Sequence, residues 1–93
     1  MTEREAISIA TALMKTDRGA TMVNLEEPSA VYMHGKAFIE AERLKYPKMD
    51  LDFEYNDYWL IEFPFKEVDR FQRTGLAVTV DLESKEAKLL LDL

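Results

Sequence analysis

The 93-residue sequence contains no cysteine, which excludes disulfide bonds and thiolate chemistry. Its single histidine, His34, has no nucleophile in a recognised motif beside it, and the serines lie outside any Gly-x-Ser-x-Gly sequence. The three glycines are spread over positions 19, 35 and 75, so no glycine-rich phosphate-binding loop is present. We therefore expect a protein that is not an enzyme and that uses no cofactor.

Long apolar runs are also missing. The longest run near the N-terminus, residues 6–14, is shorter than the roughly 18 residues that span a bilayer. It follows Glu3 and Glu5, whereas a signal peptide begins with basic residues. We expect no membrane contact and a cytoplasmic location.

Basic residues are in short supply as well. Lys and Arg number 12 against 18 Asp and Glu, which gives a formal charge of −6 and an isoelectric point near 4.7. Because phosphate backbones repel a net negative surface, and no Lys/Arg cluster is visible, we expect no nucleic acid partner. A basic protein partner fits this charge. The length fits one domain, residues 1–93.

The first segment carries a clear helix pattern. Thr2 and Glu5 form a capping box, and apolar residues then recur at three- and four-residue spacing. Gly19 follows the basic residues Lys15 and Arg18 as a stop signal. These features predict a helix over residues 3–17.

The segment after Gly19 alternates like a short strand. Thr21, Val23 and Leu25 would line one side of it, and Pro28 would end it.

Residues 29–46 allow two interpretations. An apolar stripe at helical spacing, ended by Pro47, favours one helix. Gly35 lies in the middle and disfavours that helix by about 1 kcal/mol relative to Ala. The alternative is a strand at residues 30–33, a turn at His34-Gly35 and a shorter helix from Lys36.

The second half of the sequence alternates like a sheet. Residues 49–55 and 58–63 predict two strands joined by a turn at Asn56-Asp57. Residues 75–81 and 87–93 predict a second pair of strands with a turn between them. Helices followed by a mainly antiparallel sheet of about four strands predict the α+β class.

One stretch, KMDLDFEYNDYW at residues 48–59, places an acidic or amide side chain at every second position. A calcium loop that began at Asp50 would need Gly at its sixth position and Glu at its twelfth, and neither is present, so we predict no metal site. In a strand, Asp50, Asp52 and Glu54 share one face. That face is either solvated or a docking surface for a basic protein.

Aromatic residues are concentrated in residues 53–65, and most are expected to pack in the core. Tyr58 and Trp59 are adjacent on one predicted strand, so they point to opposite faces and cannot share one core. Because Tyr and Trp are enriched at binding hot spots, the exposed one is a candidate interface anchor. The predicted partner-binding residues are Asp50, Asp52, Glu54, Asp57, Tyr58 and Trp59.

Two parts of the chain resemble known small domains. TEREAISIATALM resembles the helix that opens PepSY-like and related cystatin-like or NTF2-like domains. YWLIEFPF resembles their Trp-x-Val-x-Phe strand, and LAVTVDLESKEAKLLL their closing hairpin, with Ser84-Lys85 in place of the usual Thr-Gly. Several bacterial toxin-immunity families share this outline. The resemblance covers residues 2–14 and 58–91 and implies no catalytic residues.

These observations leave more than one hypothesis for function. The first is a non-enzymatic bacterial inhibitor of the immunity or antitoxin type. It would neutralise a basic effector through the acidic row formed by Asp50, Asp52 and Glu54. The alternative is a ligand-binding or enzymatic cystatin-like or NTF2-like domain with a pocket lined by Tyr32, Trp59 and Phe63. A homodimer through the sheet face opposite the helices is a third hypothesis.

Overall fold

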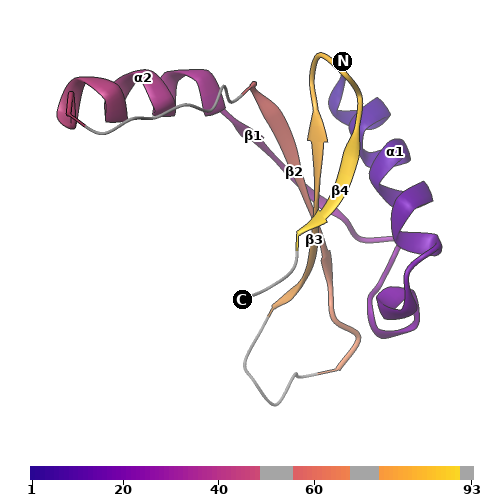
Figure 1. Ribbon diagram of the computed structural model, residues 1–93. Helices are drawn as coiled ribbons and strands as arrows, with labels where there is room; N and C mark the ends of the chain where they lie inside the picture. Colours follow the sequence, from indigo (N-terminus) through magenta and orange to yellow (C-terminus); the bar gives the residue numbers. More distant parts are fainter. Residues whose placement is uncertain (49–55, 68–73, 91–93) are drawn as a thin grey trace.

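The computed structural model describes residues 1–48, 56–67 and 74–90 (Figure 1). These residues contain two α-helices, a short 3₁₀ helix and one four-stranded antiparallel sheet, which confirms the predicted α+β class. In chain order the elements are α1 (Glu3–Lys15), η1 (Arg18–Met22), β1 (Ser29–Met33), α2 (Gly35–Lys45), β2 (Tyr58–Pro64), β3 (Gly75–Asp81) and β4 (Ala87–Leu90).

The sheet is an antiparallel meander with the strand order β1-β2-β3-β4. The predicted pairing of residues 75–81 with the following strand is confirmed, with Thr79 opposite Lys88. The predicted hairpin partner of β2, residues 49–55, lies outside the described residues. Within the described sheet, the two edges of β2 are occupied by β1 and β3.

Helix α1 forms where the sequence predicts it. The Thr2 side chain accepts a hydrogen bond from the Glu5 amide at 3.1 Å, which satisfies one free donor of the first turn. The helix ends at Lys15, two residues before the predicted end, because the Thr16 amide and hydroxyl both bond to the carbonyl of Leu13.

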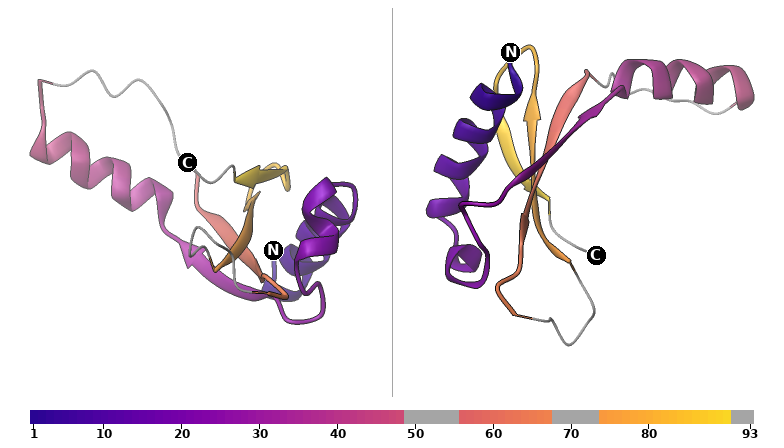
Figure 2. Two further views of the ribbon diagram at one scale, coloured as in Figure 1. Left: turned by 90° about the horizontal axis from the view of Figure 1, so that it is seen from below. Right: turned by 180° about the vertical axis from the view of Figure 1, so that it is seen from behind.

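The core lies between α1 and one face of the sheet (Figures 1 and 2). The small side chains of Ala6 and Ala10 are fully buried, which allows the helix to approach the strands closely. The buried cluster consists of Ala6, Ala10, Met14, Val23, Ile61, Phe63, Val78 and Val80.

The prediction of a strand at residues 21–25 is wrong. Asp17 caps the 3₁₀ helix by accepting a hydrogen bond from the Gly19 amide at 2.7 Å. Asn24 accepts from the Glu26 amide at 3.0 Å, which turns the chain again. Between these two turns, Val23 makes a single isolated bridge to Phe65.

The prediction of one helix over residues 29–46 is also wrong, and the strand-plus-helix alternative is confirmed. Residues 29–33 pair along the edge of β2, with Val31 opposite Leu60. Gly35 is the first residue of α2 rather than its middle, so its low helix propensity costs little there. Helix α2 then extends away from the sheet (Figures 1 and 2).

Candidate functional site

One face of the sheet is covered by α1, and the opposite face carries no described helix (Figure 2). We call this second surface the open face. The strand register places Val31, Leu60, Thr79 and Lys88 in one row across it. Val31 is 52% exposed and Leu90, at the far edge, is 51% exposed. A sheet face with exposed aliphatic residues is therefore available for binding.

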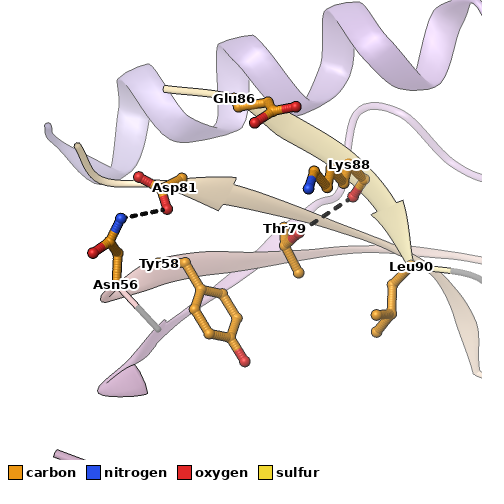
Figure 3. Close-up of a pocket in the computed structure, with 7 residues that line it drawn as sticks. All are labelled: Asn56, Tyr58, Thr79, Asp81, Glu86, Lys88 and Leu90. Carbon is orange, nitrogen blue, oxygen red and sulfur yellow. Dashed lines mark hydrogen bonds between the residues drawn. The ribbon is translucent and has the colours of Figure 1, made fainter. Parts of the chain in front are cut away.

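A shallow depression of about 400 Å³ lies on the β2–β4 half of the open face (Figure 3). Tyr58 extends from β2 and Leu90 from β4 on the same side of the sheet, which gives the depression its apolar surface. Carboxylates of Asp81 and Glu86 supply negative charge, and Lys88 supplies one positive charge. The lining residues are Asn56, Tyr58, Thr79, Asp81, Glu86, Lys88 and Leu90.

Asp81 is held in place by the turn between β3 and β4. Its Oδ1 accepts hydrogen bonds from the amides of Glu83, at 2.8 Å, and Ser84, at 2.9 Å. The Asn56 side-chain amide donates to Oδ2 at 3.2 Å (Figure 3). The backbone bond from Ser84, with the smaller effects of Asn56 and Glu83, lowers the pKa of Asp81. Asp81 therefore keeps a fixed negative charge beside the depression at neutral pH.

Asp57, one of the predicted partner-binding residues, has internal partners. Its Oδ2 accepts a hydrogen bond from the Tyr32 hydroxyl at 2.9 Å, and its Oδ1 accepts from the Lys36 backbone amide at 3.2 Å. The Tyr32 bond is the main reason that the pKa of Asp57 is lowered and that the pKa of Tyr32 is raised. Asp57 thus has a structural role at the start of α2 in addition to its charge.

The structure places Tyr58 and Trp59 on opposite faces, as their adjacent positions in a strand require. Tyr58 is half-buried and lines the depression, so it is the aromatic of the pair that lies on the open face. Trp59 packs against the core cluster and meets Tyr32 edge to face, with ring centroids 5.3 Å apart. Its Nε1 is buried without a hydrogen-bond partner among the described residues.

The predicted aromatic pocket is not formed by its three residues. Phe63 is fully buried in the core, and Trp59 packs against that core rather than around an open cavity. The Tyr32 hydroxyl donates a hydrogen bond to Asp57, and its ring lies tilted against the ring of His34, at 4.7 Å between ring centroids.

The remaining predicted site residues, Asp50, Asp52 and Glu54, lie outside the described residues. In the described part of the chain, no group of three or more His, Asp or Glu side chains is placed to hold a metal ion. Nor do residues 1–48, 56–67 and 74–90 include a helix that is long and apolar enough to cross a membrane.

Sequence reasoning did not single out Asp81, Glu86, Lys88 or Leu90 as site residues. Their one signal is the polar side of the alternating β3 segment, where Thr79 lies between the buried Val78 and Val80 and Asp81 follows Val80. The register of β3 with β4 brings the other members beside them, and pairing register is not visible in a single segment.

Comparisons of the chain with protein-family models, with curated proteins and with solved structures found no match. The resemblance to cystatin-like, NTF2-like or PepSY-like domains therefore stays a prediction.

Proposed function

We propose that this protein is a non-enzymatic binding domain that docks a basic protein on the β2–β4 half of its open face, as an inhibitor of the immunity or antitoxin type. The observation that carries the proposal is the depression, whose lining combines the Tyr58 side chain with the carboxylates of Asp81 and Glu86. An aromatic ring next to fixed negative charge suits a lysine or arginine side chain, which gains cation–π and ionic contacts together.

The charge of the whole chain supports the same partner. A formal charge of −6 attracts a basic protein over a distance of about 8–10 Å at ordinary ionic strength and raises its association rate. Asp50, Asp52 and Glu54 directly precede the site segment in the sequence and would add to this attraction. The ion pair of Lys36 with Glu83, at 2.9 Å, neutralises part of the charge nearby.

A small-ligand site is the second candidate. The depression volume of about 400 Å³ falls within the range of known ligand pockets, which is about 300–1,000 Å³. Such pockets usually bury most of the ligand, whereas this one opens along the sheet face (Figure 3). A protein side chain that enters from above fits this shape better than an enclosed ligand does.

The test is capture of partners from the source cell with four immobilised forms of the protein. Wild type is compared with Glu86→Lys, which reverses a charge in the depression, and with Glu27→Lys, which makes the same change at an exposed turn before β1. A further variant carries both Asp52→Lys and Glu54→Lys and tests whether the acidic row adds to the binding of the partner. Captured proteins are identified at low and at high salt.

We expect wild type and Glu27→Lys to retain one basic protein in stoichiometric amount at low salt and to release it at high salt. Glu86→Lys should retain much less of it. Equal retention by all forms would show that the open face is not the docking surface. If no form captured a protein, and a small molecule were recovered from the purified protein, the ligand-site alternative would be favoured.

A further inference from the structure

Helix α2 and the β1–β2 half of the open face are two apolar surfaces that the described part of the chain leaves uncovered. We propose that they cover each other between two copies of this chain, so that α2 of each copy lies along β1 and β2 of its partner. The inference rests on α2 and on Val31 and Leu60, which the proposed function does not use, and the two surfaces meet at β2, where Tyr58 lies.

The exposed side of α2 is apolar. Ala37, Phe38, Ala41 and Leu44 recur at the spacing of one helical stripe, and all four are exposed. Phe38 is 62% exposed and Leu44 is 86% exposed. Ile39, on another side of α2, is buried, whereas this stripe stays exposed and gains burial only from a further surface.

The sheet offers a surface of matching size. Helix α2 is about 16 Å long at 1.5 Å per residue, and the five residues of β1 extend about 16 Å at 3.3 Å per residue. Val31 and Leu60 lie side by side at the centre of this half of the face. A helix has about the width of two strands, so it would cover β1 and β2 and leave the β3–β4 side accessible.

The exposed surface of the chain is large enough to supply a dimer interface. The chain exposes 7097 Å², whereas a compact monomer of 10.8 kDa exposes about 5,500 Å² by the usual size scaling. The difference of about 1,600 Å² exceeds the roughly 800 Å² that each partner buries in a standard interface.

Charge also favours a second copy. Helix α2 carries three basic residues (Lys36, Arg43, Lys45) and two acidic ones (Glu40, Glu42), a net charge of +1 in a chain of −6. The β1–β2 half of the open face carries one described charged residue, the acidic Glu62, a net charge of −1. The helix and the face that it would cover therefore attract each other.

Introduced cysteines test this arrangement cleanly, because the chain has none of its own. Ala41→Cys lies at the middle of the exposed stripe and Val31→Cys at the middle of β1, so the test does not depend on the direction of the helix. The two single variants carry different tags, are mixed in equal amounts and are oxidised. One control mixture pairs Val31→Cys with Arg43→Cys, on the side of α2 opposite the stripe, and the other pairs Ala41→Cys with Ser8→Cys, at an exposed position of α1.

We expect the Ala41→Cys and Val31→Cys chains to form a mixed disulfide several-fold more than either control mixture. Light scattering of the wild type should give twice the chain mass of 10.8 kDa, and Leu44→Glu should return it to one chain mass. The proposal would be overturned if the wild type is a monomer and a chain that carries both Ala41→Cys and Val31→Cys forms an intramolecular disulfide. In that case α2 would lie on the sheet of its own chain. A dimer with mixed disulfide at the control level would place the interface elsewhere and overturn it equally.

Discussion

Asp57 caps the N-terminus of α2 by accepting a hydrogen bond from the backbone amide of Lys36, 21 residues earlier in the chain, at 3.2 Å. His34, the residue at the cap position, makes no side-chain hydrogen bond to the helix. A carboxylate near the first turn also stabilises the helix dipole. The segment before β2 therefore fixes the point at which β1 ends and α2 begins.

Removal of the Asp57 side chain should loosen the start of α2. Asp57→Ala removes both acceptor oxygens and the charge, whereas Asp57→Asn removes the charge and one acceptor oxygen but keeps the other. We expect amide hydrogen exchange in the first turn of α2 to accelerate most in Asp57→Ala and less in Asp57→Asn, with α1 unaffected. Equal exchange rates in all three proteins would mean that Asp57 is not the cap.

The stability of the fold should fall in acid. The pKa values of Asp57 and Asp81 are lowered in the folded protein, chiefly by the Tyr32 hydroxyl and by the Ser84 amide respectively. A lowered folded-state pKa gives stability that is present above the unfolded pKa, near 4, and lost as the pH falls through the folded value. Urea unfolding between pH 7 and pH 2 measures this loss, and Asp57→Asn should show a shallower one.

Tyr32→Phe should change the pH dependence of stability both in acid and in alkali. It removes the main cause of the lowered pKa of Asp57, so the acid loss should again become shallower. The pKa of Tyr32 is raised in the folded protein, so its contribution to stability is lost as the pH rises above about 10. The phenylalanine variant should lack that alkaline loss. If Tyr32→Phe lost as much stability in alkali as the wild type does, that result would contradict the Tyr32–Asp57 hydrogen bond.

Two methionines provide a matched test of the core. Met14 is fully buried between α1 and the sheet, whereas Met22 is 49% exposed. Met14→Ala should lower the free energy of unfolding by about 2–5 kcal/mol, and Met22→Ala by about 0.5 kcal/mol or less. Urea unfolding followed by the fluorescence of Trp59, the single tryptophan, gives both values. Similar losses for the two variants would contradict the placement of the core.

Two glycines differ in what a methyl group would meet. At Gly75 the added carbon would clash with the backbone carbonyl of Phe63 across the strand pair, and backbone cannot move aside cheaply. At Gly19 it would meet the ends of the Leu76 and Asp17 side chains, which can rotate. Gly75→Ala should therefore lower the thermal midpoint clearly more than Gly19→Ala does. The reverse order would contradict the close approach of β2 and β3.

The parts of the fold that sequence predicts well are specified locally. Helix α1 carries its own cap at Thr2 and its own apolar stripe, and β3 alternates between buried and half-buried residues. The boundary between β1 and α2 is different, because β1 pairs with β2 and the cap of α2 comes from Asp57. Neither contact is visible in residues 29–46 alone, which is why their helical spacing was misleading.

In the candidate site, too, some features follow from the local sequence and others depend on contacts between distant segments. The strand pattern predicts that Tyr58 and Trp59 separate to opposite faces, and they do. It could not predict that Glu86 and Leu90 join Tyr58, because that depends on how β4 pairs with β3. Nor could it predict that the carboxylate of Asp57 is bonded to Tyr32.

The association rate of the captured basic protein with the wild type, measured at low and at high salt, tests the central claim most directly. We expect a rate that falls steeply as salt rises, a much lower rate for Glu86→Lys at low salt, and a far smaller decrease for Glu27→Lys, which changes only the net charge. A rate that is insensitive to salt, or that Glu86→Lys and Glu27→Lys lower equally, would contradict docking at the acidic depression beside Tyr58.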